Sequence, residues 1–150
     1  MIKLKGFEEI SRKLKELDSK VSNKIVRKGV SKMAQIVRKD MRARSPNKTG
    51  TLRKELRYKI TRLKTGGFNA EVGAFNKAFY ANFIEKGTKK HTIKPKKGNK
   101  VISFGGRSAA SVSHPGTKAR PFIEPALKSK QNEAVREAGR IIMSEILKIL

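Results

Sequence analysis

The stretch Ala119-Arg120-Pro121-Phe122-Ile123-Glu124-Pro125-Ala126-Leu127 decides how this chain folds, because it joins an irregular middle region to a long amphipathic segment. Pro121 restricts the preceding residue to extended geometry, whereas Pro125 has no amide hydrogen to lose in the first turn of a helix. We therefore expect the chain to enter this stretch extended and to leave it helical. Three apolar side chains are expected to anchor the junction in the core: Phe122, Ile123 and Leu127.

The segment after this junction is expected to be the last helix, over residues 125–149. Its apolar residues recur three and four positions apart, which is the spacing of one buried helix face. The residues expected to face inward are Leu127, Ala134, Ala138, Ile141 or Ile142, Ile146 and Ile149. We expect this helix to lie on a sheet, beside an earlier long helix.

Residues 7–45 show the same spacing and predict helices in the N-terminal region. A first apolar stripe consists of Phe7, Ile10, Leu14, Leu17 and Val21. A second continues through Ile25 or Val26, Val30, Met33, Val37 and Met41. Asp18 or Ser19 can cap a helix of residues 20–44, which Ser45-Pro46 then ends. Gly29 inside this helix either permits close packing or marks a bend.

The middle region, residues 52–118, predicts a sheet with an inserted short helix. Two runs that alternate apolar and polar residues indicate an antiparallel hairpin closed near Gly66-Gly67; their apolar members are Leu56, Tyr58 and Ile60, then Phe68, Ala70 and Val72. Residues 79–86 predict a helix that ends at Gly87 in the left-handed conformation. Its inward residues are expected to be Phe79 and Phe83, with Tyr80 and Ile84 as further candidates.

A second, basic hairpin is expected farther along the chain, between Thr92–Pro95 and Lys100–Phe104. The residues between these runs, 96–99, include the Gly and Asn that suit a tight turn. Pro95 favours an edge position, since proline cannot donate to a strand ladder. Residues 105–111 are poor in large apolar side chains and are expected to form a mobile loop.

The composition limits the class of protein. A chain of 150 residues fits one domain, and we expect residues 1–150 to form one. Cysteine is absent, which excludes disulfides, thiolate metal sites and thiol chemistry. Neither a signal peptide nor an apolar run of the length that a membrane span needs is present, so a soluble protein made in a cytoplasm, with no membrane partner, is expected.

Charge is the strongest signal in the composition: 37 Lys and Arg stand against 12 Asp and Glu, for a net charge of +25. From Lys86 to Arg120 there are ten basic residues and no acidic one. Such density repels itself unless anions screen it, which favours phosphate, above all nucleic acid, as a neighbour. A solvated face is the alternative. The basic residues of the expected hairpin and loop that would contact DNA or a protein partner are Lys94, Lys96, Lys97, Lys100 and Arg107.

The sequence offers no set of residues for catalysis, for a metal or for a cofactor. Glu85 is a lone carboxylate beside Lys86, and acid–base catalysis needs a positioned partner. His91 and His114 are 23 positions apart with no nearby Asp, Glu or Cys, and nucleases with two metal ions need a carboxylate cluster. Gly50 lacks the neighbours of a phosphate-binding loop. We therefore predict a protein that is not an enzyme and has no cofactor.

An ordered set of short fragments resembles one known family. The fragments are Thr49-Gly50-Thr51-Leu52-Arg53, Tyr80 to Thr88, Ile93-Lys94-Pro95-Lys96, Val101-Ile102-Ser103-Phe104, His114-Pro115-Gly116-Thr117 and Ala119 to Leu127. In this order and at these spacings, from about Leu17 onward, they resemble the head–tail joining or tail-completion family of long-tailed bacteriophages and prophages. The positions that carry the likeness are Gly50, Leu52, Arg53, Tyr80, Glu85, Gly87, Thr88, Arg120, Pro121, Phe122 and Pro125.

This resemblance implies a structural virion protein of the neck or upper tail, assembled in the host cytoplasm, that forms a ring and contacts phage neck and tail proteins. The fold that we predict is α+β: N-terminal helices and a C-terminal helix packed on a small antiparallel sheet with a projecting basic hairpin. The alternative function is sequence-independent nucleic-acid binding by residues 86–120. Because Phe104 is the one Phe, Tyr or Trp among residues 86–120, base stacking is not expected there.

Overall fold

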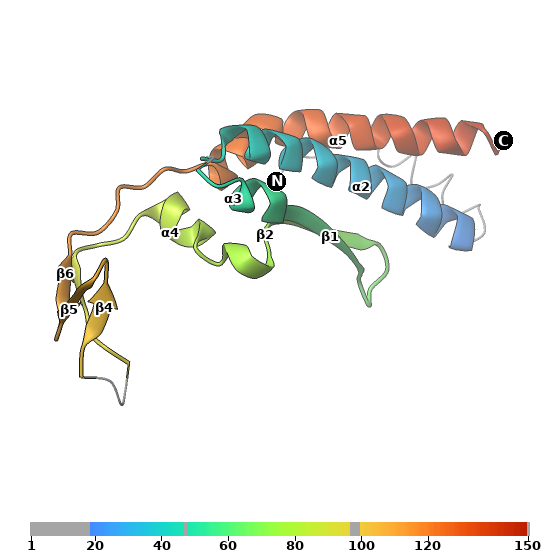
Figure 1. Ribbon diagram of the computed structural model, residues 1–150. Helices are drawn as coiled ribbons and strands as arrows, with labels where there is room; N and C mark the ends of the chain where they lie inside the picture. Colours follow the sequence, from blue (N-terminus) through green and yellow to red (C-terminus); the bar gives the residue numbers. More distant parts are fainter. Residues whose placement is uncertain (1–18, 47, 97–99, 150) are drawn as a thin grey trace. The chain divides into compact units, whose positions relative to one another are not determined.

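A computed structural model describes residues 19–46, 48–96 and 100–149. Helices and short antiparallel sheets make up this part of the chain, so the α+β class is confirmed (Figure 1). The chain divides into two compact units, residues 1–78 with 122–150 and residues 79–121, which are treated separately below. The single domain expected from the length stays a prediction. None of the described helices is long and apolar enough to cross a membrane.

Helix α2 (Ser19–Arg44) is the central element of the first unit. Of the predicted stripe, Ile25, Val37 and Met41 are buried. Val30 and Met33 are only half-buried, and the smaller Gly29 and Ala34 take the buried positions beside them. The helix stops where the sequence predicts, since Ser45 Oγ donates to the carbonyl oxygen of Arg42 at 2.9 Å and Pro46 follows. The expected earlier stripe from Phe7 to Leu17, and the cap at Asp18, lie outside the described residues.

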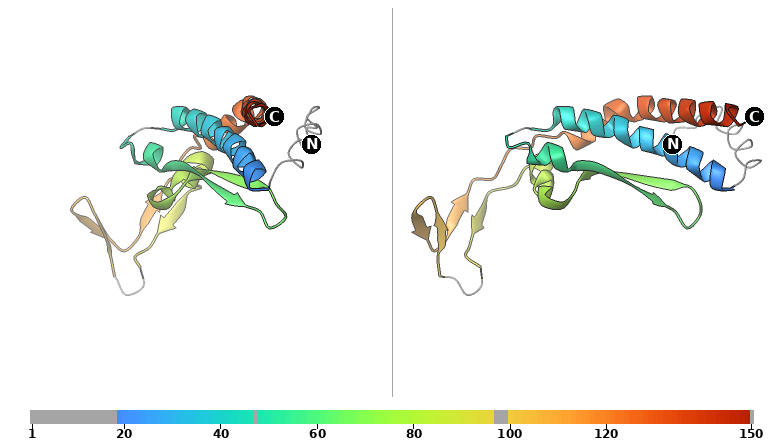
Figure 2. Two further views of the ribbon diagram at one scale, coloured as in Figure 1. Left: turned by 90° about the vertical axis from the view of Figure 1, so that its right-hand side faces the viewer. Right: turned by 45° about the vertical axis from the view of Figure 1, so that its right-hand side comes forward.

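Helix α5 (Ile123–Leu147) packs along α2, and the two helices run side by side (Figure 2). Ile25 meets Ile142, Ile146 and Met143 in a buried cluster. Gly29 makes this approach feasible, because a Cβ there would lie 2.7 Å from Cγ1 of Ile142 and 3.2 Å from the carbonyl oxygen of Ala138. Of the two roles open to Gly29, close packing is therefore the one that the structure supports.

The predicted first hairpin is present as β1 (Leu56–Arg62) and β2 (Phe68–Ala74), paired antiparallel from Leu56 with Ala74 to Arg62 with Phe68. Helix α2 contacts both this hairpin and α5. The expected packing of α5 on the sheet is therefore mainly indirect, since α2 is the element that joins them. Polar contacts add to the packing: the Tyr58 hydroxyl lies 3.2 Å from Ser31 Oγ, and the Arg38 guanidinium lies 5.2 Å from the centre of the Tyr58 ring.

Of the three side chains expected to anchor the junction before the last helix, Phe122 is buried, Ile123 is half-buried and Leu127 is exposed. Phe122 is fully buried and precedes the first turn of α5, in which Pro125 lies. The inward face of α5 is Ala126, Ala134, Ala138, Ile142 and Ile146. Leu127 and Ile149 were expected on that face, but they are 51% and 50% exposed. The small Ala126 takes the buried position in the first turn, because the face in contact with α2 is one residue out of register with Leu127.

Two short helices were only partly foreseen. Helix α3 (Thr51–Glu55) follows Gly50, which is left-handed, and η1 (Asn76–Ala78) follows β2. Helix α4 (Ala81–Lys86) ends at Gly87 as expected, and φ of Gly87 is positive, at 70°. Its ψ of −177° differs from the expected left-handed helical conformation, because Gly87 leads directly into an extended strand. The inward placement of Phe79 and Phe83 is wrong, since they are 76% and 53% exposed. Ala81 takes the buried position instead, and Tyr80 and Ile84 are half-buried.

The predicted pairing of the second hairpin is also wrong. Strand β3 (His91–Ile93) pairs with β6 (Val112–His114), while β4 (Ile102–Phe104) pairs with β5 (Arg107–Ala109). The expected loop at 105–111 therefore contains a strand. Gly105 and Gly106 both have positive φ, 52° and 75°, which is the requirement of a two-residue hairpin turn with strand-like twist. Most of the expected turn at 96–99 lies outside the described residues.

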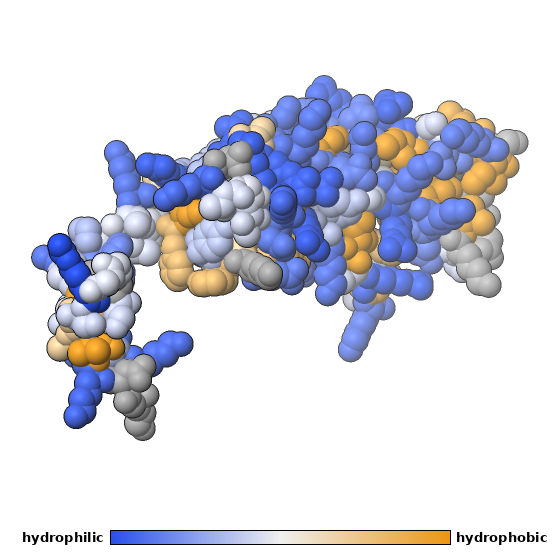
Figure 3. All heavy atoms as spheres, in the orientation of Figure 1, coloured by the Kyte–Doolittle hydropathy of each residue, from blue (hydrophilic) through white to orange (hydrophobic). Residues whose placement is uncertain are grey.

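Hydrophilic side chains cover much of the visible surface over α2 and α5 (Figure 3). A polar network joins the two helices: Arg44 Nε donates to Asp40 Oδ2 at 2.6 Å, and Ser129 Oγ of α5 donates to the same oxygen at 3.1 Å. The hydrogen bond from Arg44 is the main reason that the pKa of Asp40 lies below its usual value, while partial burial opposes the shift.

Asp40→Asn is expected to cost less than about 1 kcal/mol, because the pair is partly exposed to solvent. The pKa of Asp40 is lower in the folded than in the unfolded state. Its stabilisation is therefore complete above the unfolded value of about 3.9 and is lost as the pH falls through the folded value. Urea unfolding of both proteins over a series of pH values should show a difference that is largest at pH 7 and shrinks as the pH falls below about 3.9. Glu71→Gln, on an exposed strand position, controls for the loss of one charge.

Candidate functional site

The second unit contains an antiparallel ribbon of residues 86–120, here called the basic ribbon. Thr88 pairs with Thr117, and His91, Thr92 and Ile93 pair with His114, Ser113 and Val112. Each step forward on one strand matches one step back on the other, so the isolated bridge and the β3–β6 pair share one register. Backbone hydrogen bonds of 2.9 and 3.0 Å in both directions join Thr88 and Thr117. The sequence prediction missed this pairing, since 29 positions separate the two threonines.

Two glycines allow the strands to approach at the base of the basic ribbon. Gly116 has φ 90°, and a Cβ there would overlap the carbonyl oxygen of Thr88. Gly87 has φ 70°, and a Cβ there would lie 2.5 Å from the carbonyl oxygen of Thr117. The Arg120 amide donates to the carbonyl oxygen of Ile84 at 2.8 Å, which ties the returning strand to α4. A conformation that few residues other than glycine adopt is thus required on both strands.

The basic side chains predicted as a partner surface lie on or beside the strands of this ribbon. Lys94, Lys96 and Lys100 follow β3 or precede β4, and Arg107 opens β5; all four are exposed. Lys97 lies outside the described residues. No carboxylate occurs between Lys86 and Arg120, so the positive charge of the basic ribbon has no counter-charge within it. This arrangement suits a polyanion or an acidic protein surface.

The two histidines, expected to be too far apart to act together, are direct partners across the ladder. Their rings stack with centroids 5.0 Å apart. Nδ1 of His91 lies 2.8 Å from the carbonyl oxygen of Lys89 and must donate to it, whereas Nδ1 of His114 accepts from the Gly116 amide at 3.0 Å. The pairing of β3 with β6 brings the two rings together, although the histidines are 23 positions apart in the sequence. Within the described residues, no three potential ligands gather around a metal-sized space.

The positions that carried the family likeness lie at element ends, in the core and in the return into α5. Gly50 has φ 76° where the chain turns into α3, Leu52 is buried, and Arg53 donates to the carbonyl oxygen of Ser45 at 3.3 Å. Tyr80 precedes α4 and Glu85 lies in it, before Gly87 and Thr88 at the base of the basic ribbon. The remaining positions form the return into α5: Arg120, Pro121, Phe122 and Pro125.

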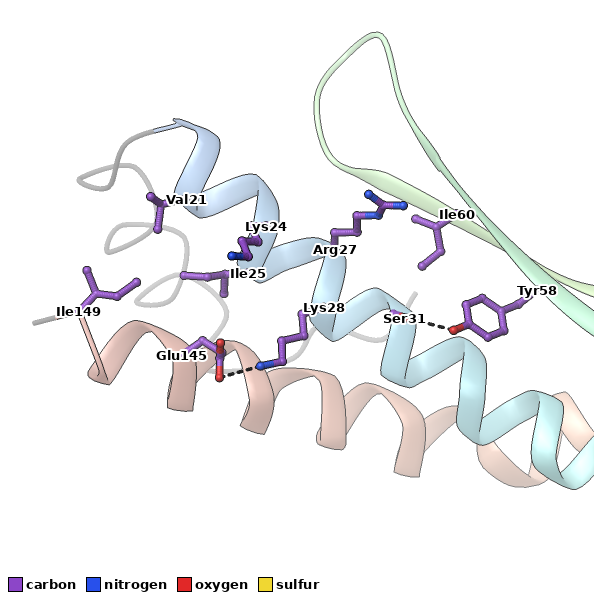
Figure 4. A pocket seen from close by; sticks show the side chains of 10 residues that line it. All are labelled: Val21, Lys24, Ile25, Arg27, Lys28, Ser31, Tyr58, Ile60, Glu145 and Ile149. Carbon is purple, nitrogen blue, oxygen red and sulfur yellow. Dashed lines mark hydrogen bonds and ion pairs between the residues drawn. The ribbon is translucent and has the colours of Figure 1, made fainter.

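The first unit contains a groove that the sequence did not predict. It has a volume of about 810 Å³ and lies between the first half of α2, β1 and the end of α5 (Figure 4). Val21, Ile25, Ile60 and Ile149 give it apolar walls, and Lys24, Arg27 and Lys28 add positive charge. The signal available in the sequence was the recurrence of basic residues beside the apolar stripe of α2.

Comparison with known protein families assigns the chain to a family. Residues 8–87, just over half of the chain, match the family model described as "Bacteriophage HK97-gp10, putative tail-component". The matched range includes α2, α3, the first hairpin, η1 and α4, and it stops at the base of the basic ribbon. No curated protein and no solved structure matches the chain.

Proposed function

This chain belongs to the HK97-gp10-like family of bacteriophage tail components, and we propose that it joins head to tail as a ring in the neck or upper tail of the virion. The family assignment supports a structural role in the tail and a location in the virion. The ordered fragments of residues 49–53, 80–88 and 119–127 support the joining role specifically. The partners are other neck and tail proteins, and assembly takes place in the host cytoplasm.

Removal of the gene from the phage tests the joining role. We expect lysates to contain DNA-filled heads and complete tails that are not attached to each other, and added protein should restore joined particles. Electron microscopy of the lysates distinguishes the outcomes. Absence of tails, or tails of abnormal length, would assign the protein to tail construction and contradict a joining role. Chemical cross-linking of purified virions should give a ladder of this chain that ends at the ring number.

A second function is supported by the basic ribbon, whose ten basic residues face no acidic one within it. We propose non-specific contact with the phosphate backbone of the viral DNA. Such binding weakens linearly with the logarithm of the salt concentration, by about 0.9 log unit per neutralised phosphate. Base stacking is not part of this proposal, since cations alone can account for backbone contact.

Changing Lys94, Lys96, Lys97, Lys100 and Arg107 to Gln should reduce that salt slope by several units. Stability should stay nearly unchanged, because the four of these residues that the structure describes are exposed, and exposed cations contribute little to folding. A matched control changes five basic residues of the first unit with the same loss of charge: Lys48, Lys54, Lys59, Arg62 and Lys64. Salt titration with labelled duplex DNA measures the slope, and complementation of the gene deletion measures phage yield.

The two variants separate the readings of the basic ribbon. A reduced slope for the ribbon variant alone supports DNA contact. A normal slope with reduced phage yield assigns the basic ribbon to a protein neighbour in the neck. Equal changes in both variants would mean that overall charge, and not the basic ribbon, determines binding. If neither property changes, the positive charge is a solvated surface.

A further inference from the structure

The groove of the first unit has apolar walls that the described residues leave partly uncovered. Val21 is 36% exposed and Ile149 50% exposed, and both line it. At its inner end Ser31 and Tyr58 form a hydrogen bond of 3.2 Å (Figure 4). An apolar concavity of this size, rimmed by polar groups, is the kind of surface that an amphipathic segment covers.

The charges at the groove favour an acidic occupant. Lys24 and Arg27 are exposed at its edge, while Lys28 forms an ion pair of 3.0 Å with Glu145 of α5. Two cations beside apolar walls would attract a segment that carries carboxylates next to apolar residues. The charged phosphate backbone of a DNA strand, in contrast, would gain nothing from contact with the apolar walls.

A segment with these properties lies at the N-terminal side of α2. Residues 7–18 hold four of the twelve acidic residues of the chain, Glu8, Glu9, Glu16 and Asp18, against three basic ones. The apolar residues of the segment recur with helical spacing: Phe7, Ile10, Leu14 and Leu17. This is the amphipathic and acidic character that the groove requires.

Length and attachment also agree. The segment joins α2 at Ser19, two residues before Val21 at the outer end of the groove. The groove follows α2 from Val21 to Ser31, about 15 Å at 1.5 Å per residue, and twelve helical residues would span about 18 Å. The family match begins at residue 8, so this segment belongs to the region that the family shares.

We propose that residues 7–18 fold back from Ser19 and occupy the groove between α2, β1 and α5, with their apolar side against Val21 and Ile60 and their carboxylates near Lys24 and Arg27. Covalent attachment gives the segment a high effective concentration at the groove, so it outcompetes acidic segments of other proteins. The head-to-tail assignment is not needed for this inference, and either can fail without the other.

Because the chain has no cysteine, engineered pairs report this contact directly. Three full-length variants combine Ile60→Cys with Ile10→Cys, Leu14→Cys or Leu17→Cys. Three are needed because the position of the segment along the groove is to be determined, and a disulfide forms only where the two Cα atoms lie about 4.4–6.8 Å apart. At least one is expected to oxidise to a monomeric, thiol-free product. The matched control, Leu14→Cys with Ala43→Cys, places the second thiol at the other end of α2 and should keep its thiols.

Two further measurements complete the test. Ile10→Ser with Leu14→Ser should lower Tm by several degrees, whereas Lys13→Ser with Lys15→Ser should leave it unchanged. Lys24→Glu with Arg27→Glu should slow disulfide formation several-fold at low salt, and less at high salt. Disulfide-linked dimers in dilute solution would show that a second copy supplies the segment. Free thiols in all three pairs, or equal Tm for the two serine variants, would also overturn the proposal.

Discussion

Phe122→Ala is expected to lower the free energy of unfolding by about 3–5 kcal/mol, the usual range for deleting a fully buried aromatic ring. Phe122 has no exposed surface and stands where the extended return of the chain becomes α5. The lost ring removes apolar burial and leaves a cavity at the point that fixes the start of this helix. Urea unfolding followed by circular dichroism measures the loss.

Phe79→Ala is the matched control, since the same ring is removed from a side chain that is 76% exposed. Its effect on the free energy of unfolding should stay within about 0.5 kcal/mol, as for surface substitutions in general. Equal losses for the two variants would contradict the burial assigned to both positions. The comparison also tests the correction at α4, where the sequence placed Phe79 inside.

Gly116→Ala is expected to disrupt the base of the basic ribbon, with a cost on the order of 3 kcal/mol from two sources. An L-residue is strained at φ 90°, and the added Cβ would overlap the carbonyl oxygen of Thr88 and lie 2.9 Å from the carbonyl carbon of Lys89. These neighbours are backbone atoms, which cannot turn aside as a side chain can. Hydrogen exchange should show loss of protection at the amides of Thr88 and Thr117.

Gly106→Ala controls for the backbone strain alone. Gly106 has a similar φ of 75°, but no atom lies within 4 Å of the position that its Cβ would take. The cost should be about 1 kcal/mol and confined to the β4–β5 turn, with protection at Thr88 and Thr117 retained. If both variants lose protection at these amides, close approach of the strands at Gly116 is not the reason for the glycine.

The family match and the basic ribbon support different parts of the proposed function. The match covers residues 8–87 and supports the tail role through the helices and first hairpin. The basic ribbon begins where the match stops, and its proposed contact rests on its exposed cations and on the absence of carboxylates. A variant that removes those cations therefore tests the DNA contact without testing the family assignment.

Local sequence determined the elements whose signals lie within a few residues. The spacing of Ile25, Val37 and Met41 predicted α2, and Ser45-Pro46 predicted its end, because helix periodicity and proline geometry act over a single turn. Alternation around Gly66-Gly67 predicted the first hairpin for the same reason. Phe122 was correctly placed in the core, because it is a large apolar ring in a segment whose backbone is restricted by two prolines.

Only the tertiary structure decided which segments meet. Phe79 and Phe83 are exposed because burial in a one-turn helix depends on the partner that covers it, and here Ala81 takes the covered position. Strand β3 pairs with β6, and β4 with β5, although the turn residues at 96–99 predicted the nearer pairing of β3 with β4. Short strands of three residues carry too little pattern to select a partner.

The groove beside α2 and the histidine pair could not be predicted from the sequence, and the physical reason is the same for both. Each depends on backbones brought together over a separation of more than twenty residues: α2 with β1 and α5, and His91 with His114. Residue type and spacing report the surface that one element offers, and this is why charge and periodicity predicted the basic region and the helices. Which surface another element covers is set by long-range packing, which sums many weak contacts over the whole unit.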